Sequence, residues 1–134
     1  MTIAILSALL DEQRGLLNEL SNPVKMRRGG RDFWCGRWHG HEVVLALSRI
    51  GKVAAATTAT TLIEAFDVDT IVFTGVAGGI GPGVRVGDVV VAREFVQHDL
   101  DSSPLFARYE IPLYGRTTLP CDVALTALLL EAVS

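Results

Sequence analysis

The sequence predicts a soluble α/β domain, and three observations support this. Short apolar stretches, typical of buried strands, alternate with stretches whose apolar residues follow the period of an α-helix. The 134 residues fit one domain, and a composition that is 49% hydrophobic and 20% charged is apolar enough for a core. A glycine-rich loop, Thr74–Gly81, directly follows an apolar strand, and we expect it to be the centre of a ligand site.

The charge balance narrows the class of partner. A formal net charge of −3 disfavours a nucleic-acid binder, because binding a phosphate backbone needs a basic surface. The apolar start is followed at once by Asp11 and Glu12, and no basic residue precedes it, so we predict neither a secretory signal nor a membrane span. We therefore expect a cytoplasmic protein. Cys35 and Cys121 lack any metal-ligand spacing; a disulfide is possible, but two reduced thiols are favoured.

The first two predicted elements are a strand and a helix. Thr2–Leu6 is a short apolar run that indicates a buried strand. Leu9–Leu20 has apolar residues at helical spacing, with Ser7 as a suitable N-cap and acidic residues in the first turn. Ser21-Asn22-Pro23 is expected to end this helix.

An antiparallel meander is predicted next. Val24–Arg28, Asp32–Trp38 and Glu42–Ser48 are strand-like runs. Gly29-Gly30 and His39-Gly40 lie between them and are typical of tight turns.

A second helix is predicted over Lys52–Phe66, beginning after Gly51. One face of it is rich in small residues that permit close packing, and we expect this face to form part of a homodimer interface. The small residues are Ala54, Ala55, Ala56 and Ala59.

Four further segments complete the chain. Asp69–Phe73 is nearly all apolar, as expected of a strand buried on both faces, and Val86–Val96 is also strand-rich. Gln97–Arg116 resembles a long irregular loop, of the kind that is usually functional or mobile. Asp122–Val133 is predicted to be an apolar helix; since it has no clear stop signal, we expect more protein to follow.

The loop Thr74–Gly81 has no standard phosphate-binding signature. Its glycines allow backbone N–H groups to approach a ligand closely. Its spacing is neither Gly-x-Gly-x-x-Gly nor that of a P-loop. A tight turn without a ligand is the alternative interpretation.

Few titratable residues stand out. Glu12 could be an acid/base group or a charge at a helix start, a role that Asp11 could equally fill. His98-Asp99-Leu100-Asp101 has carboxylates at a spacing that can bind a cation, but nothing else in the sequence supports a metal site, so a solvated loop is expected. His39 and His41 flank a turn and are expected at the surface.

Taken in order, several segments resemble one known family, the nucleoside phosphorylase superfamily. The similarity is greatest to its hydrolytic branch, the 5′-methylthioadenosine/S-adenosylhomocysteine nucleosidases, and it extends over nearly the whole chain, up to the loop after Asp101. The segments are Ile3–Glu12, Ile50–Ala56, Thr74–Gly79, Val86–Val91 and His98–Asp101.

This resemblance implies a fold and a class of ligand. The fold is a three-layer arrangement, a central mixed β-sheet flanked by helices, of which residues 1–134 are the N-terminal part of a single domain. The ligand is an adenine nucleoside, the assembly a homodimer and the context methionine salvage. The resemblance implies no cofactor and no metal.

The resemblance also implies a reaction, the hydrolysis of the N-glycosidic bond with release of adenine. An acid protonates the purine, and Glu12 is the carboxylate that activates the attacking water. Backbone in the glycine-rich loop flanks the water and the purine, while a loop after residue 98 reaches across the dimer to the neighbour's 5′-substituent. The implied binding residues are Leu9, Ile50, Val76, Ala77, Gly78, Ser102, Leu105 and Phe106.

Val76 favours water over phosphate as the nucleophile. Phosphorylases of this family commonly have a Ser or Thr hydroxyl at this position. Val76 has no such donor, and losing that hydrogen bond costs a bound phosphate about 1–3 kcal/mol. A phosphorylase, a hydrolase of another nucleoside such as futalosine, and a non-catalytic dimerising or nucleoside-binding remnant are the alternatives.

Two features of the family are missing from these residues. The family's second half supplies a Met-Glu pair that binds the ribose and an Asp that protonates adenine, whereas the only methionines here are Met1 and Met26. General acid catalysis contributes about 10²–10⁴-fold. We therefore expect this chain alone to be a poor catalyst or an inactive one.

Overall fold

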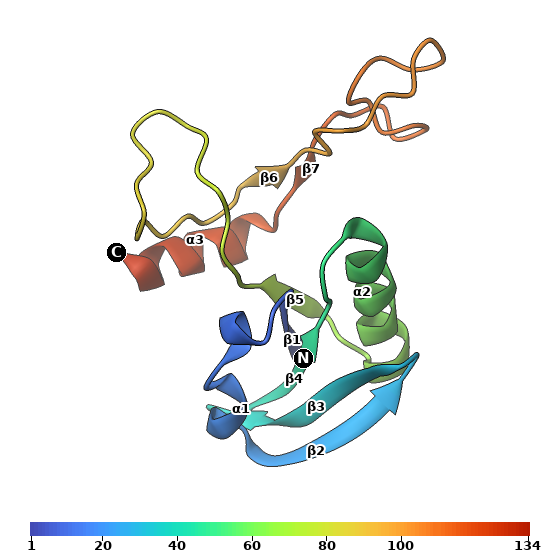
Figure 1. The fold of residues 1–134 in the computed structure, drawn as a ribbon. Helices are drawn as coiled ribbons and strands as arrows, with labels where there is room; N and C mark the ends of the chain where they lie inside the picture. The colour runs from blue at the N-terminus through green and yellow to red at the C-terminus, as the bar shows by residue number, and fades with distance from the viewer. The chain divides into compact units, whose positions relative to one another are not determined.

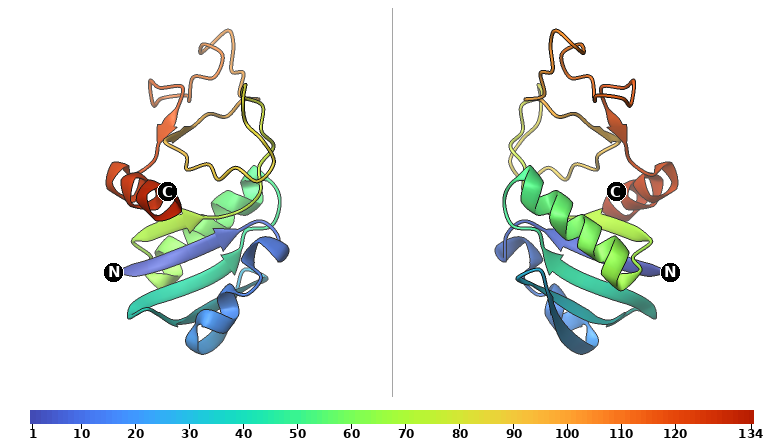
Figure 2. Two further views of the ribbon diagram at one scale, coloured as in Figure 1. Left: turned by 90° about the vertical axis from the view of Figure 1, so that its left-hand side faces the viewer. Right: turned by 90° about the vertical axis from the view of Figure 1, so that its right-hand side faces the viewer.

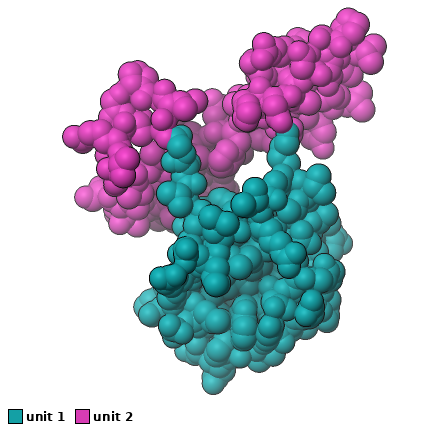
Figure 3. All heavy atoms as spheres, in the orientation of Figure 1, with its two compact units in different colours: residues 1–78 teal, residues 79–134 magenta.

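The structure is a computed structural model that describes all of residues 1–134. The chain divides into two compact units, residues 1–78 and residues 79–134, which are coloured separately in Figure 3. Each unit is described by itself below. The expectation of one domain over 1–134 stays a prediction.

The first unit is built on one five-stranded sheet with the strand order β2-β3-β4-β1-β5 (Figure 1). One longer helix, one short helix and a 3₁₀ turn accompany the sheet. In chain order the elements are β1 (Thr2–Ser7), the 3₁₀ turn η1 (Asp11–Gln13), α1 (Leu16–Glu19), β2 (Ser21–Arg28), β3 (Arg31–Trp38), β4 (His41–Leu47), α2 (Lys52–Phe66) and β5 (Thr70–Phe73).

The sheet is mixed, which confirms the predicted class of fold. β2, β3 and β4 pair antiparallel in succession, as the meander prediction requires. His39 and the glycines of both turns have positive φ, the conformation that tight hairpin turns need. β1 pairs parallel with β4 on one side and with β5 on the other, so the carboxyl ends of these three strands lie at the same edge of the sheet.

Apolar side chains fill both faces of this sheet and make three layers within the first unit. On one face, Ala4 and Leu6 of β1 and Val44 and Ala46 of β4 pack with Leu62 of α2. Figure 2 shows the helix α2 crossing this face of the sheet. On the other face, Val43 and Leu45 pack with Leu20 and the leucines of α1. Because successive strand residues point to opposite faces, β4 is buried on both sides. The boundaries of α2 are those predicted.

Phe33 is the largest side chain buried completely in this core, and its ring lies 4.7 Å from that of Phe66, centroid to centroid. We expect Phe33→Ala to lower the free energy of unfolding by about 3–5 kcal/mol, because it removes a buried ring and leaves a cavity. Urea unfolding measures this loss. Phe95→Ala is the matched control, since Phe95 is 59% exposed; an equal loss in both variants would contradict the assignment of the core.

The predicted helix over Leu9–Leu20 is wrong in extent. Only η1 and the four residues of α1 are helical, and Gly15 separates them with a φ of 92°, a value that an α-helix cannot contain. Leu10 is 71% exposed. Ser7 is not an N-cap but the last residue of β1, and 21–23 belong to β2 rather than to a helix stop.

Two strand predictions also need correction. β5 is an edge strand in which no residue is fully buried, and Phe73 is 55% exposed, so this strand is not buried on both faces. Within 86–96 only β6 (Glu94–Phe95) is a strand, paired with β7 (Leu119–Pro120). Apolar alternation is not enough to make a strand, because its backbone N–H and C=O groups need a partner strand. Val86 is accordingly fully exposed.

The second unit ends in the predicted helix, α3 (Val123–Val133). Asp122 is its N-cap, and the carboxylate accepts a hydrogen bond from the N–H of Leu125 at 2.9 Å. The predicted loop 97–116 contains no helix and only one isolated bridge, between Ile111 and Arg116. No helix of the chain is of a length and apolarity that would span a bilayer. Cys35 and Cys121 are both free thiols.

Candidate active site

Three loops meet at the carboxyl edge of the parallel strands in the first unit. They follow β1, β4 and β5, and two backbone hydrogen bonds hold them side by side. The N–H of Ser48 donates to the carbonyl of Ser7 at 2.8 Å, and the N–H of Thr74 donates to the carbonyl of Leu6 at 2.9 Å. Crevices at this edge are the usual ligand sites of open α/β sheets.

The carboxylate of Glu12 lies at the centre of this edge and joins two of the loops. Its Oε2 accepts hydrogen bonds from the N–H groups of Ala8 at 2.9 Å and Leu9 at 2.8 Å. Its Oε1 accepts from the N–H of Val76 at 2.9 Å. The side chain that the sequence left open as a helix-start charge is therefore a tertiary contact between the loop after β1 and the glycine-rich loop.

Gly75 is required for this contact. A Cβ at this position would lie 2.8 Å from Oε1 and 2.9 Å from Cδ of Glu12, closer than real Cβ contacts come. Gly75 is not in the left-handed region, so its role is to leave space and not to permit a special φ. The sequence pattern pointed to the glycine-rich loop but not to this individual glycine.

The three donors set the protonation state of Glu12. The N–H groups of Val76 and then Leu9 lower the pKa of the half-buried carboxyl from its ordinary value, against a smaller opposing effect of burial. Glu12 is thus an anion at neutral pH, with its carboxylate fixed in position. An ionised carboxylate can orient a water and accept its proton.

A pH dependence follows from this lowered pKa. Because the folded pKa lies below the unfolded value, the stabilisation by Glu12 is fully present above the unfolded pKa and is lost as the pH falls through the folded pKa. We expect the amide ¹⁵N and ¹H shifts of Ala8, Leu9 and Val76 to titrate together, with a midpoint below that of an ordinary glutamate. A midpoint at or above that of an ordinary glutamate would contradict the arrangement.

The structure brings together most of the predicted site residues. Leu9, Ile50 and Val76 are exposed on the three loops at this edge, at 46%, 77% and 85%, and are accessible to a ligand. Ala77 and Gly78 follow Val76 and are also exposed. All five belong to the first unit, together with Glu12.

The other three predicted binding residues belong to the second unit. Ser102, Leu105 and Phe106 form a local turn, in which the carbonyl of Ser102 accepts from the N–H groups of both others, at 3.1 and 3.2 Å. Their role over a neighbour's ligand stays a prediction.

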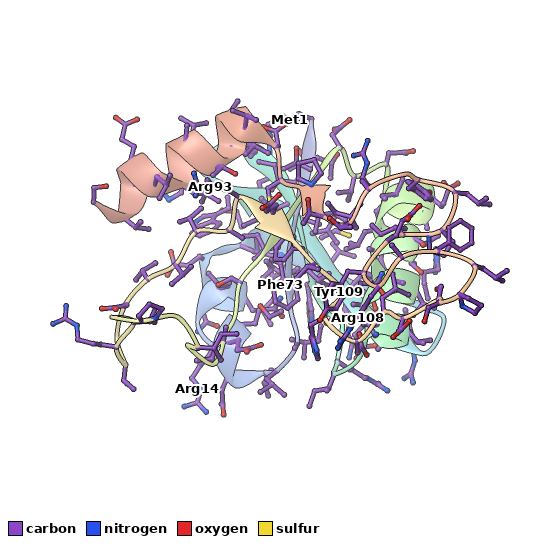
Figure 4. The ribbon with its side chains drawn as sticks, turned by 90° about the horizontal axis from the view of Figure 1, so that it is seen from above. Met1, Arg14, Phe73, Arg93, Arg108 and Tyr109 are labelled. Atoms are coloured by element: carbon purple, nitrogen blue, oxygen red, sulfur yellow. The ribbon has the colours of Figure 1, made fainter.

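The same loop carries Asp101, whose carboxylate accepts from the N–H and hydroxyl of Ser103, and these bonds lower its pKa. Further along, the Arg108 guanidinium lies 4.8 Å from the ring centroid of Tyr109, and Figure 4 labels both. No three His, Cys, Asp or Glu side chains cluster so as to hold a metal ion.

Two buried serines at the site were not predicted. Ser7 and Ser48 end neighbouring parallel strands, and both are almost completely buried. The Ser48 hydroxyl donates to the carbonyl of Arg49 at 2.8 Å, which holds the start of the third loop. The available signal was a serine at the carboxyl end of each apolar run, Ser7 as the last residue of β1 and Ser48 just after β4.

The fold and this edge define an α/β protein with a candidate ligand site at the ends of its parallel strands. The model of the phosphorylase superfamily matches residues 2–134, and the chain belongs to that family.

Three relatives illustrate the match. The chain is 39% identical over 101 residues to an aminodeoxyfutalosine nucleosidase of Campylobacter jejuni, covering 75% of this chain and 44% of that protein. It is 33% identical over 136 residues to a 5′-methylthioadenosine/S-adenosylhomocysteine nucleosidase of Aeromonas salmonicida, covering 100% and 58%. An S-adenosylhomocysteine nucleosidase of Streptococcus pyogenes, solved with 5-methylthiotubericidin, superposes with a TM-score of 0.93 at 30% identity, covering 99% and 56%. The chain thus spans about half the length of these relatives.

Proposed function

We propose that this chain supplies the water-activating part of a nucleosidase, one that hydrolyses the N-glycosidic bond of 5′-methylthioadenosine or S-adenosylhomocysteine and releases adenine. The observation that carries the proposal is the Glu12 carboxylate, ionised and held by three backbone N–H groups at the edge of the parallel strands. Related proteins named as nucleosidases of these substrates support it.

In the proposed reaction, Glu12 orients a water molecule and accepts its proton as the water oxygen attacks the ribose carbon. The bond from that carbon to the purine nitrogen breaks, and its electron pair leaves with the base. Leu9 and Ile50 provide apolar surface beside the sugar, and the backbone of Val76, Ala77 and Gly78 flanks the water and the purine. Ser102, Leu105 and Phe106 cover the 5′-substituent of a partner subunit in a homodimer. We propose a role in methionine salvage, in the cytoplasm.

The geometry favours water over phosphate for a reason beyond the missing hydroxyl. The N–H of Val76 is already bound by Glu12, so it is not free for a phosphate oxygen. A phosphate here would also lie beside an ionised carboxylate, and like charges at close range repel. Both effects weaken a phosphorylase site.

Adenine release from 5′-methylthioadenosine tests the proposal. The assay compares the chain alone with a chimera, in which residues 1–134 are followed by the part of the Aeromonas salmonicida relative beyond the matched region. We expect release by the chimera without phosphate, and far slower release by the chain alone. Strict dependence on phosphate would contradict the hydrolytic assignment.

Aminodeoxyfutalosine is the second substrate to test, because a relative is named for it. A clear preference of the chimera for that nucleoside would move the assignment to the futalosine branch. Binding of 5′-methylthioadenosine to the chain alone, followed by the amide shifts of Leu9 and Val76, provides a measurement that does not depend on the chimera's folding. The absence of both binding and turnover would leave the non-catalytic alternative.

A further inference from the structure

A cleft lies in the first unit, on the face of the sheet that carries α1. It has a volume of about 470 Å³, within the range of small-molecule sites. Residues of η1, α1, β2, β3 and the end of β4 line it, and the Glu12 carboxylate and the glycine-rich loop do not. The cleft therefore adjoins the loops after β1 and β4, but it does not include the Glu12 carboxylate.

Basic side chains outnumber acidic ones in the lining of the cleft. Four basic side chains line it, Arg14, Lys25, Arg31 and Arg49, against a single carboxylate, Asp32. Asp32 is bound by Lys25 at 2.8 Å, and its pKa is lowered by Lys25 first and by nearby arginines, among them Arg49. Asp32 thus offsets one of these four positive charges.

Two of these cations are available to a ligand. Arg14 forms an ion pair with Asp11, which lies outside the lining. Arg31 and Arg49 form no ion pair. The Arg31 guanidinium donates to the carbonyl of Ala54 in α2 at 3.5 Å, while its Nε is buried without a hydrogen-bond partner. A buried donor without a partner is costly, and an anion bound at the cleft would satisfy it. Guanidinium groups suit phosphate oxygens because their donors form a planar fork.

The backbone at Arg49 provides a second observation. Its φ is 65°, in the left-handed region that a non-glycine residue adopts at a cost. Glycine would suit this position better, yet the chain has an arginine whose side chain lines the cleft. Such strain is concentrated at functional sites.

Beside these charges and the polar side chains of Gln13 and Asn18, the lining has an apolar surface that can select the rest of the ligand. Leu10, Leu17, Leu47 and the ring of Trp34 form this surface. Inorganic phosphate would leave it unused. We propose that the cleft binds an organic phosphate monoester, with the phosphate at Arg31 and Arg49 and an apolar ring against Trp34 and the leucines.

Phenyl phosphate is a suitable probe, because it has a ring and a phosphate but no adenine or ribose for the candidate active site. Binding is followed by NMR, through the Trp34 indole N–H and the Arg49 amide. We expect both signals to shift with phenyl phosphate, and weaker binding of inorganic phosphate and of phenol. Millimolar phenyl phosphate that shifts neither signal would overturn the proposal.

Arg49→Gly is the decisive variant, since glycine fits a φ of 65° and the fold should be kept. Losing one charged hydrogen-bonding group should weaken phenyl phosphate binding by about 10-fold or more. Arg28→Gln is the matched control, because Arg28 ends β2 outside the cleft and its guanidinium donates to the carbonyl of Arg27. Unchanged affinity in Arg49→Gly, or an equal loss in both variants, would also overturn the proposal.

Discussion

Replacing Glu12 by glutamine is expected to slow adenine release by the chimera by about 10²–10⁴-fold, the usual contribution of a general base. An amide cannot accept the proton of water at neutral pH. The NH₂ group of the new glutamine would also face an N–H donor, either those of Ala8 and Leu9 or that of Val76. At least one of the hydrogen bonds that the carboxylate accepts would therefore be lost as well. Nucleoside affinity should change little, because the carboxylate acts on the water. Steady-state kinetics separates the effect on turnover from the effect on nucleoside affinity, and we expect a fall in kcat with a nearly constant KM.

Asp11→Asn is the matched control for Glu12→Gln. Asp11 is the neighbouring carboxylate in the same turn, it is exposed, and it pairs with Arg14 rather than with the site. It should retain wild-type turnover. If both variants lost activity equally, the effect would come from the charge of the turn and not from the position of the Glu12 carboxylate.

Adding one methyl group at Gly75 is expected to have a similarly large effect. In Gly75→Ala the new Cβ would lie 2.8 Å from Oε1 of Glu12, so the carboxylate must leave its place between the two loops. A flexible side-chain end can move at low cost, and φ at Gly75 is ordinary, so the fold should be kept. We expect adenine release to fall by about 10²-fold or more, within the range for loss of a positioned base, with an unchanged circular dichroism spectrum.

A double-variant cycle tests whether the two changes act through the same group. If Gly75→Ala acts only by displacing the carboxylate, the double variant with Glu12→Gln should be no slower than Glu12→Gln alone. Additive losses would show that Gly75 contributes in some other way. The amide shift of Val76 offers an independent check, because its hydrogen bond to Glu12 should be lost in Gly75→Ala.

Local patterns were sufficient where an element depends on its own residues. The meander followed from strand runs separated by Gly29-Gly30 and His39-Gly40, because tight turns need residues that tolerate positive φ. The helix Lys52–Phe66 and the final helix α3 also followed from local patterns. Local patterns failed where the outcome depends on a partner. The stretch 86–93 is as apolar as a strand, but it has no neighbour to pair with.

The helix expected over Leu9–Leu20 shows why the site needed the structure. Its leucines have helical spacing, but the segment bends at Gly15, and Glu12 turns its carboxylate to the N–H groups of Ala8, Leu9 and Val76. The contact between Glu12 and Val76 spans 64 positions, a distance that no periodicity can report.

By itself, the sequence determined the mixed α/β fold and indicated the segments of the candidate site, because strand, turn and helix signals are local and the family motifs are contiguous. Only the tertiary structure decided that Glu12 is an anchored anion, that Gly75 makes room for it, and that a cationic cleft lies beside Trp34. These features arise because the parallel order β4-β1-β5 brings the ends of distant strands to one edge of the sheet, where backbone N–H groups and side chains from separate loops meet.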